Sequence, residues 1–287
     1  MNELPKWMDV FLVPVISVAI ALLISGLVVL AIGEDPLRAV EIMLYGAFGN
    51  SYNLGFTLYY FTNFLFTGLA VALAFHASQF NIGAEGQAIF AGIGAALVGL
   101  YFDQTHWLIV LPLGILVAFA FGAAWAFIPA YLQAKRGSHI VITTIMFNYI
   151  AAGLTVALLS NLLKPVGQQA PQTRTFGDGA HLPRIDEMLA WIGVEVQRME
   201  GNIMFFVALI VCFLVWLFLW RTHLGYEIRA FGHSETATEY SGVSSFKIIV
   251  VVMLISGGLA GLLATNAVLG QQHRLALGFV EGAGFTG

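Results

Sequence analysis

The run from Asn81 to Gln87 carries a close group of polar side chains in a region that is otherwise apolar and almost uncharged. Asn81, Glu85 and Gln87 provide two amides and a carboxylate, and Glu85 is the lone acid of the region. Asn81 is a suitable N-cap, and the glycines around it permit backbone shapes that other residues resist. A helix that begins at membrane depth leaves N–H groups that must face protein or a water-filled cavity. Because broken helices often form transport sites, this run is a candidate substrate pathway.

Glu85 allows two interpretations. A carboxylate inside a membrane is costly and usually functional, which favours a role in solute binding or gating. Glu85 would equally be an ordinary first-turn acid at the membrane interface, where it complements the helix dipole. The residues alone leave both interpretations open.

A second polar group lies in the apolar stretch 138–163. Thr144, Asn148 and Thr155 recur at helical spacing and share one stripe. Neutral hydrogen-bonding groups of this kind suit an uncharged polar solute in a low-dielectric path. The same groups commonly join helices to each other in membrane bundles. Both uses stay open, and Asn148 is the best single candidate for the path.

The segment 221–246 predicts two short amphipathic helices between spans. Its apolar stripe at i, i+4 and i+7 consists of Leu224, Ile228 and Phe231. Ser234 is placed to cap a second helix that carries Glu235 and Glu239. Two such helices are typical of a docking surface for a cytoplasmic partner, and a solvated loop on the lipid headgroups is the alternative.

Small residues predict close helix packing at two places. Ala88, Gly92 and Ala96 form one small-xxx-small face, and Gly257 with Gly261 form another. Other chemistry lacks support, since the histidines show no metal-ligand spacing and the chain has no phosphate-binding loop. No pair of catalytic side chains stands out. We therefore expect neither an enzyme nor a metal or cofactor site.

The amino-acid composition indicates the kind of fold that must hold these groups in place. Of 287 residues, 59% are hydrophobic and 10% are charged, against about 25% charged in soluble domains. The excess apolar surface must face lipid, which predicts an all-α, polytopic transmembrane bundle over 1–287 as a single domain. About seven runs are long enough to cross a bilayer: 10–32, 56–75, 83–102, 107–132, 138–163, 202–220 and 247–265. The first run is too long for a signal-peptide core, and the dispersed net charge of −4 argues against a nucleic-acid partner.

Basic residues near the span ends predict a cytoplasmic N-terminus. The segments then placed inside hold Lys6, Lys135, Arg136, Arg221, Arg229 and Lys247. The short connection after the first span holds Arg38 beside three acidic residues and lies outside. The longer outer loop, about 164–201, is expected to form a folded cap with a short helix near Asp186–Ile192.

Four stretches together resemble the inner-membrane permeases of bacterial ABC importers, in the branched-chain amino acid, simple sugar and nucleoside group. They are FNIGAEGQ at 80–87, TTIMFNYIA at 143–151, GYEIRAFGHSETATEYSGV at 225–243 and GFVEGAGFTG at 278–287. The first is similar in particular to nucleoside and simple-sugar permeases. The third resembles the coupling loop that docks on the ATPase, although Glu235-Thr-Ala237 departs from the usual residues there. Family members continue beyond the last stretch, so a C-terminal truncation is expected.

The resemblance implies alternating access by paired permeases, homodimeric or heterodimeric, in the bacterial inner membrane. An ABC ATPase would supply energy, and an extracytoplasmic binding protein or lipoprotein would deliver the solute. Nucleosides are the leading solutes, followed by ribose- or galactose-like sugars. The implied pathway residues are Asn81, Glu85, Gln87, Thr144 and Asn148, and the implied coupling residues are Arg229, Glu235, Glu239 and Gly242. An ion-coupled secondary transporter is the main alternative, and Glu85 would have to serve its ion site.

Overall fold

The computed structural model describes residues 8–287, so Lys6 lies outside the described residues. These residues are helical apart from turns, loops and two isolated β-bridges. The all-α class predicted from composition is confirmed. By its contacts the chain forms two compact units, one ending at Leu54 and the other covering Gly55–Gly287. The expectation of a single domain stays a prediction.

The first unit contains two helices with a short turn, residues 33–35, between them. A short π-helical turn, Met8–Leu12, leads into α1 (Val13–Ile32), which ends at Gly33 with a φ of 96°. Helix α2 (Pro36–Phe48) replaces the short connection expected here. Asp35 caps it by accepting a 2.9 Å hydrogen bond from Leu37 N–H, and proline suits the first helical position. At about 1.5 Å per residue, α2 is too short to cross the ~30 Å hydrocarbon core.

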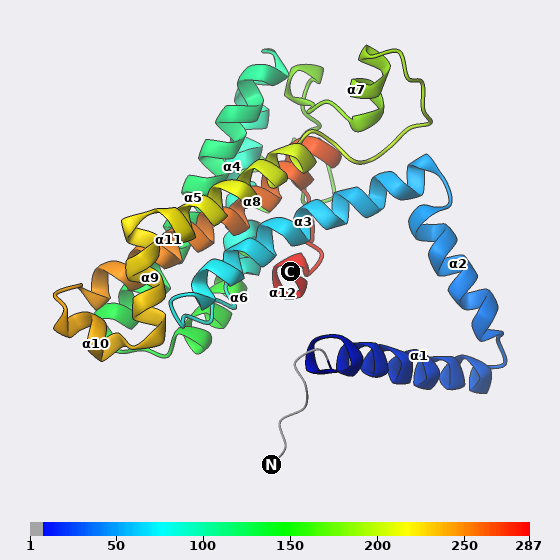
Figure 1. The fold of residues 1–287 in the computed structure, drawn as a ribbon. Coiled ribbons are helices and arrows are strands. Elements are labelled where there is room, and N and C mark those ends of the chain that lie inside the picture. Colours follow the sequence, from blue (N-terminus) through cyan, green and yellow to red (C-terminus); the bar gives the residue numbers. More distant parts are fainter. Residues whose placement is uncertain (1–7) are drawn as a thin grey trace. The chain divides into compact units, whose positions relative to one another are not determined.

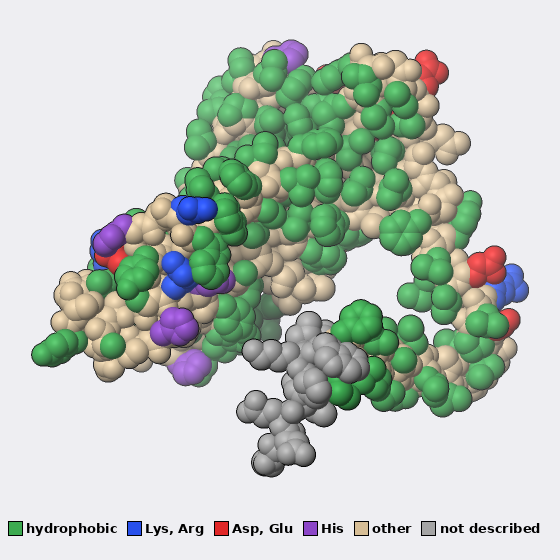
Figure 2. Space-filling model, in the orientation of Figure 1, with side chains coloured by type: hydrophobic (Ala, Val, Ile, Leu, Met, Phe, Trp, Pro, Cys, Tyr) green, Lys and Arg blue, Asp and Glu red, His purple; other side chains and the backbone are tan. Residues whose placement is uncertain are grey.

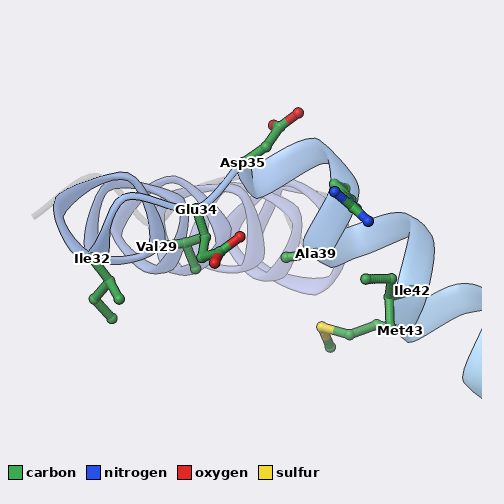
Figure 3. Close-up of a pocket in the computed structure, with 8 residues that line it drawn as sticks. Val29, Ile32, Glu34, Asp35, Ala39, Ile42 and Met43 are labelled. Atoms are coloured by element: carbon green, nitrogen blue, oxygen red, sulfur yellow. The ribbon is translucent and has the colours of Figure 1, made fainter.

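A hollow of about 630 Å³ lies between the end of α1 and α2 within this unit. It is lined by Val29, Ile32, Glu34, Asp35, Arg38, Ala39, Ile42 and Met43, most of which are labelled in Figure 3. None of these side chains is buried. The hollow therefore lacks the enclosed polar groups of a binding site. This hollow is not the candidate functional site.

The second unit contains the remaining six spans, so the predicted seven are confirmed with ends that differ by a few residues. They are α3 (Ser51–Phe75, whose first turn belongs to the first unit), α4 (Ala84–Tyr101), α5 (Trp107–Arg136), α6 (Ile140–Leu158), α8 (Met204–Arg221) and α11 (Ser245–Ala264). Two of them continue as π-helical turns, α6 through Leu159–Leu163 and α11 through Thr265–Gln271. These assignments make the chain a multi-pass membrane protein.

Helix α11 is the buried centre of this unit and packs against α5 and α4 (Figure 1). Glycines bring α5 and α11 together, because a Cβ on Gly257 would lie 2.6 Å from the Gly122 carbonyl oxygen. A Cβ on Gly261 would lie 2.5 Å from the Ala118 carbonyl oxygen. On α4, a Cβ on Gly92 would meet the Phe279 ring. All three predicted packing glycines thus lie at close approaches.

Short helices lie at both ends of the second unit (Figure 1). Helix α7 (Ile185–Trp191) belongs to the long loop at one end, where the sequence predicted a helix one residue further on. Helices α9 (His223–His233) and α10 (Glu235–Tyr240) form the other end, as predicted for 221–246. A 3₁₀ turn, Asp178–Ala180, and α12 (Ala283–Thr286) complete the described helices. We call the two ends the α7 end and the α9/α10 end.

Apolar and charged side chains lie on different parts of the surface of the second unit. Hydrophobic side chains cover its flank in Figure 2, while basic and histidine side chains gather over the α9/α10 end. Exposed residues on α8 include Phe206, Ile210, Phe213 and Trp216. Large apolar side chains exposed along a helix of this length fit a hydrocarbon environment.

Candidate functional site

The connection between α3 and α4, residues 76–83, turns back into the bundle. Asn81 Nδ2 donates a 2.8 Å hydrogen bond to Ser256 Oγ, and Ser256 Oγ donates one of 2.7 Å to the Ala70 carbonyl. Ala70 lies five residues before α3 ends at Phe75, about 8 Å along the helix axis. The start of α4 therefore lies inside the bundle, deeper than the C-terminal end of α3.

The side chain of Asn81 organises this start. Its Oδ1 accepts from Gly83 N–H at 2.9 Å and from Gln87 Nε2 at 3.1 Å, while its Nδ2 donates to Gln87 Oε1 at 3.0 Å. The N-cap position itself belongs to Gly83, so the expectation that Asn81 is the N-cap is wrong. Asn81 instead folds the approach to the helix, because its pairing with Gln87 holds the loop against the first turn.

Asn148 of α6 satisfies the free end of α4 from a neighbouring helix. Its Oδ1 accepts a 2.9 Å hydrogen bond from Gly86 N–H, and its Nδ2 donates one of 2.9 Å to the Ile82 carbonyl. Thr144 lies one turn away, where a Cβ on Gly83 would come within 3.0 Å of the Thr144 Cβ. The predicted stripe of Thr144, Asn148 and Thr155 is confirmed as the buried face of α6.

The last part of the chain, residues 272–287, turns into the bundle from the α7 end. Gly284 N–H donates a 2.9 Å hydrogen bond to Glu85 Oε2. Gly287 packs against Thr67, which lies eight residues before the end of α3, or about 12 Å along its axis. The α3–α4 connection enters the bundle from the α9/α10 end, and residues 272–287 enter it from the α7 end. These two interrupted segments thus meet beside the Glu85 carboxylate.

Glu281 adds a second carboxylate to this meeting point that the sequence analysis did not select. Its Oε2 accepts a 2.8 Å hydrogen bond from the Tyr60 hydroxyl of α3, and its side chain is exposed. Glu281 sits in a glycine-rich run without helical periodicity, so no pattern placed it at depth. A carboxylate exposed at membrane depth is unfavourable against lipid. The face that carries Glu281 is therefore better covered by water or by another protein.

Arg229 fixes α9 to the end of α8. Its Nε donates a 3.2 Å hydrogen bond to the Leu219 carbonyl, and its guanidinium lies 4.3 Å from the Trp220 ring centroid. Ile228 and Phe231 are buried, so the predicted apolar stripe faces the bundle. Ser234 caps α10 through a 3.3 Å hydrogen bond from Ala237 N–H, as predicted.

The connection 76–83 also contacts α9 directly. Ser78 has a φ of 52°, and its hydroxyl donates a 2.8 Å hydrogen bond to the Gly232 carbonyl. Three residues further along, Asn81 forms the amide pairing that begins α4. The α9/α10 end is therefore joined to the start of the broken helix through one short loop.

A polar hollow of about 500 Å³ opens beside α10. Its side chains include Gln79, Gln133, His139, Glu235 and Glu239. Gln133 Nε2 donates a 2.5 Å hydrogen bond to Gln79 Oε1, which ties the 76–83 loop to α5. Both acids are exposed, and Glu239 accepts a short hydrogen bond from Ser245 Oγ. Gly242, with a φ of 92°, ends the α10 turn.

The loop at the α7 end is anchored by an ion pair. Arg174 Nη1 lies 2.5 Å from Asp103 Oδ2, and Gly177 N–H donates a 3.1 Å hydrogen bond to the same oxygen. The Arg174 hydrogen bond lowers the pKa of the Asp103 carboxyl below its ordinary value; burial opposes this shift and Gly177 supports it. The anchored loop is therefore a folded cap, as the sequence predicted.

Two histidines stack where this cap meets the segment after α11. The His181 and His273 ring centroids lie 3.8 Å apart at 20°. Phe176 N–H donates a 2.8 Å hydrogen bond to the His273 carbonyl, which joins the cap to that segment. Burial, and then the neighbouring His181, lower the pKa of His273 from 6.5 to about 4. His273 is therefore neutral near physiological pH.

Three asparagines form a second buried amide chain nearer the α7 end. Asn202 Nδ2 donates to Asn266 Oδ1 at 2.8 Å, and Asn266 Nδ2 donates to Asn63 Oδ1 at 2.8 Å. They join the start of α8, the turn after α11 and the middle of α3. No local sequence pattern links these three residues, because they are far apart in the chain. Within residues 8–287, no cluster of side chains could hold a metal ion.

Residues 53–286 match the model of the family described as the branched-chain amino acid transport system permease component. The chain is 34% identical to the guanosine ABC transporter permease protein NupP of Bacillus subtilis, over 98% of this chain and 79% of that protein. It is 30% identical to the nucleoside ABC transporter permease protein NupB of Lactococcus lactis, over 88% and 68%. The glucose ABC transporter permease protein TsgB13 of Haloferax volcanii is 29% identical, over 99% and 74%. No solved structure matches the chain.

Proposed function

The chain belongs to the family of permease components of branched-chain amino acid transport systems, and from this premise we propose that it imports a nucleoside or simple sugar as part of an ATP-driven transporter. The observation that carries the proposal is the meeting of two interrupted segments beside Glu85. Irregular backbone at membrane depth is tolerated where it is buried in protein or lines a water-filled cavity, and such breaks are where transporters bind solute.

The pathway runs past the start of α4. Hydrogen bonds from Asn81, Gln87 and Asn148 shape this start. Thr144 packs against Gly83, and Glu85 lies on the half-buried side of the start. The amides are buried, with Asn81 and Gln87 paired to each other and Asn148 bonded to the backbone of Gly86 and Ile82, so they position the break rather than bind solute in this conformation. Glu85 retains lone pairs beyond its bond to Gly284 and is the group free to contact solute.

The ATPase acts on the permease at the α9/α10 end, which is cytoplasmic in this proposal. Glu235 and Glu239 present exposed carboxylates to an ABC ATPase, while Arg229 and Gly242 hold the shape of the docking surface. Movement of α9 reaches the broken helix through the Ser78–Gly232 hydrogen bond. Closure of the ATPases would thus change the start of α4 and alternate the access of the path.

The remaining partners follow from the two faces left exposed. The anchored cap at the α7 end receives an extracytoplasmic solute-binding protein or lipoprotein. A second permease, identical or related, covers the face that carries Glu85 and Glu281. The protein is a transport subunit of the bacterial inner membrane, with its N-terminus in the cytoplasm, and ATP hydrolysis resides in the partner.

Uptake by the complete transporter tests this proposal. The chain is expressed with an ABC ATPase, a second permease and a solute-binding protein from its own source. Uptake of radiolabelled guanosine and glucose is measured in membrane vesicles that hold ATP on the side of the ATPase. Uptake that needs ATP and stops with vanadate supports the proposal. Uptake by the chain alone, driven by an ion gradient without an ATPase, would instead establish the secondary transporter.

A further inference from the structure

A small pocket opens beside the Glu85 carboxylate, between α4, α6 and the segment 276–280. Its volume is about 210 Å³. Apolar side chains make most of the wall: Ile89, Ala152, Val156, Leu277, Phe279 and Val280. Two polar side chains, Glu85 and Thr155, also line it. The volume lies below the ~300–1,000 Å³ that encloses a drug-sized ligand, so the pocket fits one ring of a solute.

Thr155 is the unusual member of this wall. Its side chain is 3% exposed, and its hydroxyl is buried without a hydrogen-bond partner. The other threonines of α6 bond to their own helix, Thr143 to the His139 carbonyl and Thr144 to the Ile140 carbonyl. A buried hydroxyl without a partner is unfavourable and calls for an explanation such as an absent ligand.

Glu85 provides the complementary acceptor. One oxygen accepts from Gly284 N–H at 2.9 Å, and an ionised carboxylate has about four acceptor sites in all. The pocket thus offers a carboxylate for N–H or O–H donors, and the buried Thr155 hydroxyl belongs to a residue of its wall. The apolar side chains on the remaining sides offer no hydrogen bonds.

We propose that this pocket binds the heteroaromatic base of a nucleoside, with base N–H groups donating to Glu85 and Thr155 contacting the same ring. The inference rests on the proposed transport function and chooses between its two solute classes. A sugar ring carries a hydroxyl on most carbons, and several would be buried here without partners. A base has apolar faces and carries its donors on one edge, which matches a pocket with one carboxylate edge and apolar walls.

The test uses the complete transporter and compares guanosine with 1-methylguanosine, which lacks the ring N–H, and with glucose. Glu85→Gln keeps an oxygen for Gly284 N–H but removes the charge. Thr155→Val removes the unpartnered hydroxyl at nearly constant shape. We expect both variants to lower guanosine uptake per ATP hydrolysed by roughly tenfold, and Glu85→Gln to lose the preference for guanosine over 1-methylguanosine. Thr143→Val is the matched control and keeps wild-type uptake.

A binding measurement keeps the test independent of turnover. Ala152→Cys, in a Cys212→Ser background, places a thiol in the pocket wall, and Ala157→Cys places one on the next exposed turn of the same helix. Guanosine at transport-saturating concentration should slow alkylation of the first thiol and not of the second. Glucose should slow neither.

Three results would overturn the inference. If the wild type imports guanosine while both pocket variants match Thr143→Val and guanosine gives no protection, a lipid chain or a second permease fills the pocket. If it imports glucose and no nucleoside, the pocket assignment fails while the permease function stands. If it shows no ATP-dependent uptake of either solute, the proposed function fails and the inference falls with it.

Discussion

The carboxylate of Glu85 accepts a 2.9 Å hydrogen bond from the backbone N–H of Gly284, 199 residues later in the chain. The bond joins the first turn of α4 to a segment that enters the bundle from the opposite end. A Cβ on Gly284 would lie 2.7 Å from the same carboxylate oxygen, so glycine is required for the approach. The junction therefore depends on a side-chain oxygen of residue 85 and on the absence of a side chain at residue 284.

Asn148→Leu should both destabilise the protein and lower solute flux. The substitution leaves Gly86 N–H and the Ile82 carbonyl without partners at the buried start of α4. Each unpaired buried group costs about 1–3 kcal/mol. Thermal unfolding followed by tryptophan fluorescence measures the first effect and vesicle uptake the second. Unchanged uptake at full stability would remove Asn148 from the path.

Ser78→Gly should weaken the coupling between ATP hydrolysis and transport. Glycine accepts the φ of 52° without strain, so the change removes only the hydroxyl that donates to the Gly232 carbonyl. We expect a several-fold fall in solute moved per ATP hydrolysed. Co-purification with the ATPase is the control and should not change. An unaltered transport-to-hydrolysis ratio would show that the signal passes elsewhere.

The spans and the helices α9 and α10 could be predicted because hydrophobic runs and helical periodicity act within short stretches of sequence. Ile228 and Phe231 face the bundle as their spacing indicates. The hydrogen bonds of the site depend on tertiary contact, which no local pattern encodes. Asn81 looks like an N-cap by local rules, yet Gly83 takes that position and Asn148 from another helix satisfies Gly86.

Glu281 and helix α2 were missed for different reasons. Glu281 has no periodic surroundings, and its depth follows from a turn of the chain that brings Gly287 against Thr67. Helix α2 carried a readable signal, since Asp35 and Pro36 form a helix start. It was overlooked because a segment of this length does not cross a bilayer.

Gly257→Val should destabilise the contact between α5 and α11. Even the first added carbon would lie 2.6 Å from the Gly122 carbonyl oxygen, so the two central helices must separate. Overpacking of this kind typically costs about 1–3 kcal/mol. Gly153→Val is the matched control, because a Cβ there meets no atom within 4 Å. Equal melting temperatures for the two variants would contradict the packing role.

His273 should make stability depend on pH in the weakly acidic range. The unfolded side chain takes up a proton near pH 6.5, whereas the folded one does so only near pH 4. The folded state therefore binds fewer protons between these values, and its stability falls as the pH drops from about 6.5 toward 4. His181 stacks on the ring, and the positive charges of Arg184 and Arg198 also lower its pKa.

His273→Asn removes the titrating ring, and asparagine tolerates the φ of 53° at this position. The melting temperature of the variant should change less with pH between 6.5 and 4 than that of the wild type. The measurement is a series of thermal unfolding curves in detergent at fixed ionic strength. Identical slopes in the two proteins would show that another group controls the acid response.

Glu235→Arg should uncouple ATP hydrolysis from uptake while the protein remains inserted in the membrane. Glu235 is exposed on α10 and lines the polar hollow with Glu239, so reversal of its charge changes the surface offered to the ATPase without disturbing buried contacts. Charge reversal at an interface opposes a complementary partner surface. Glu41→Arg, at an exposed acid on α2, is the matched control. Membrane fractionation should find both variants inserted, and uptake should fall several-fold only in Glu235→Arg. Intact transport in that variant would exclude α10 from the docking surface.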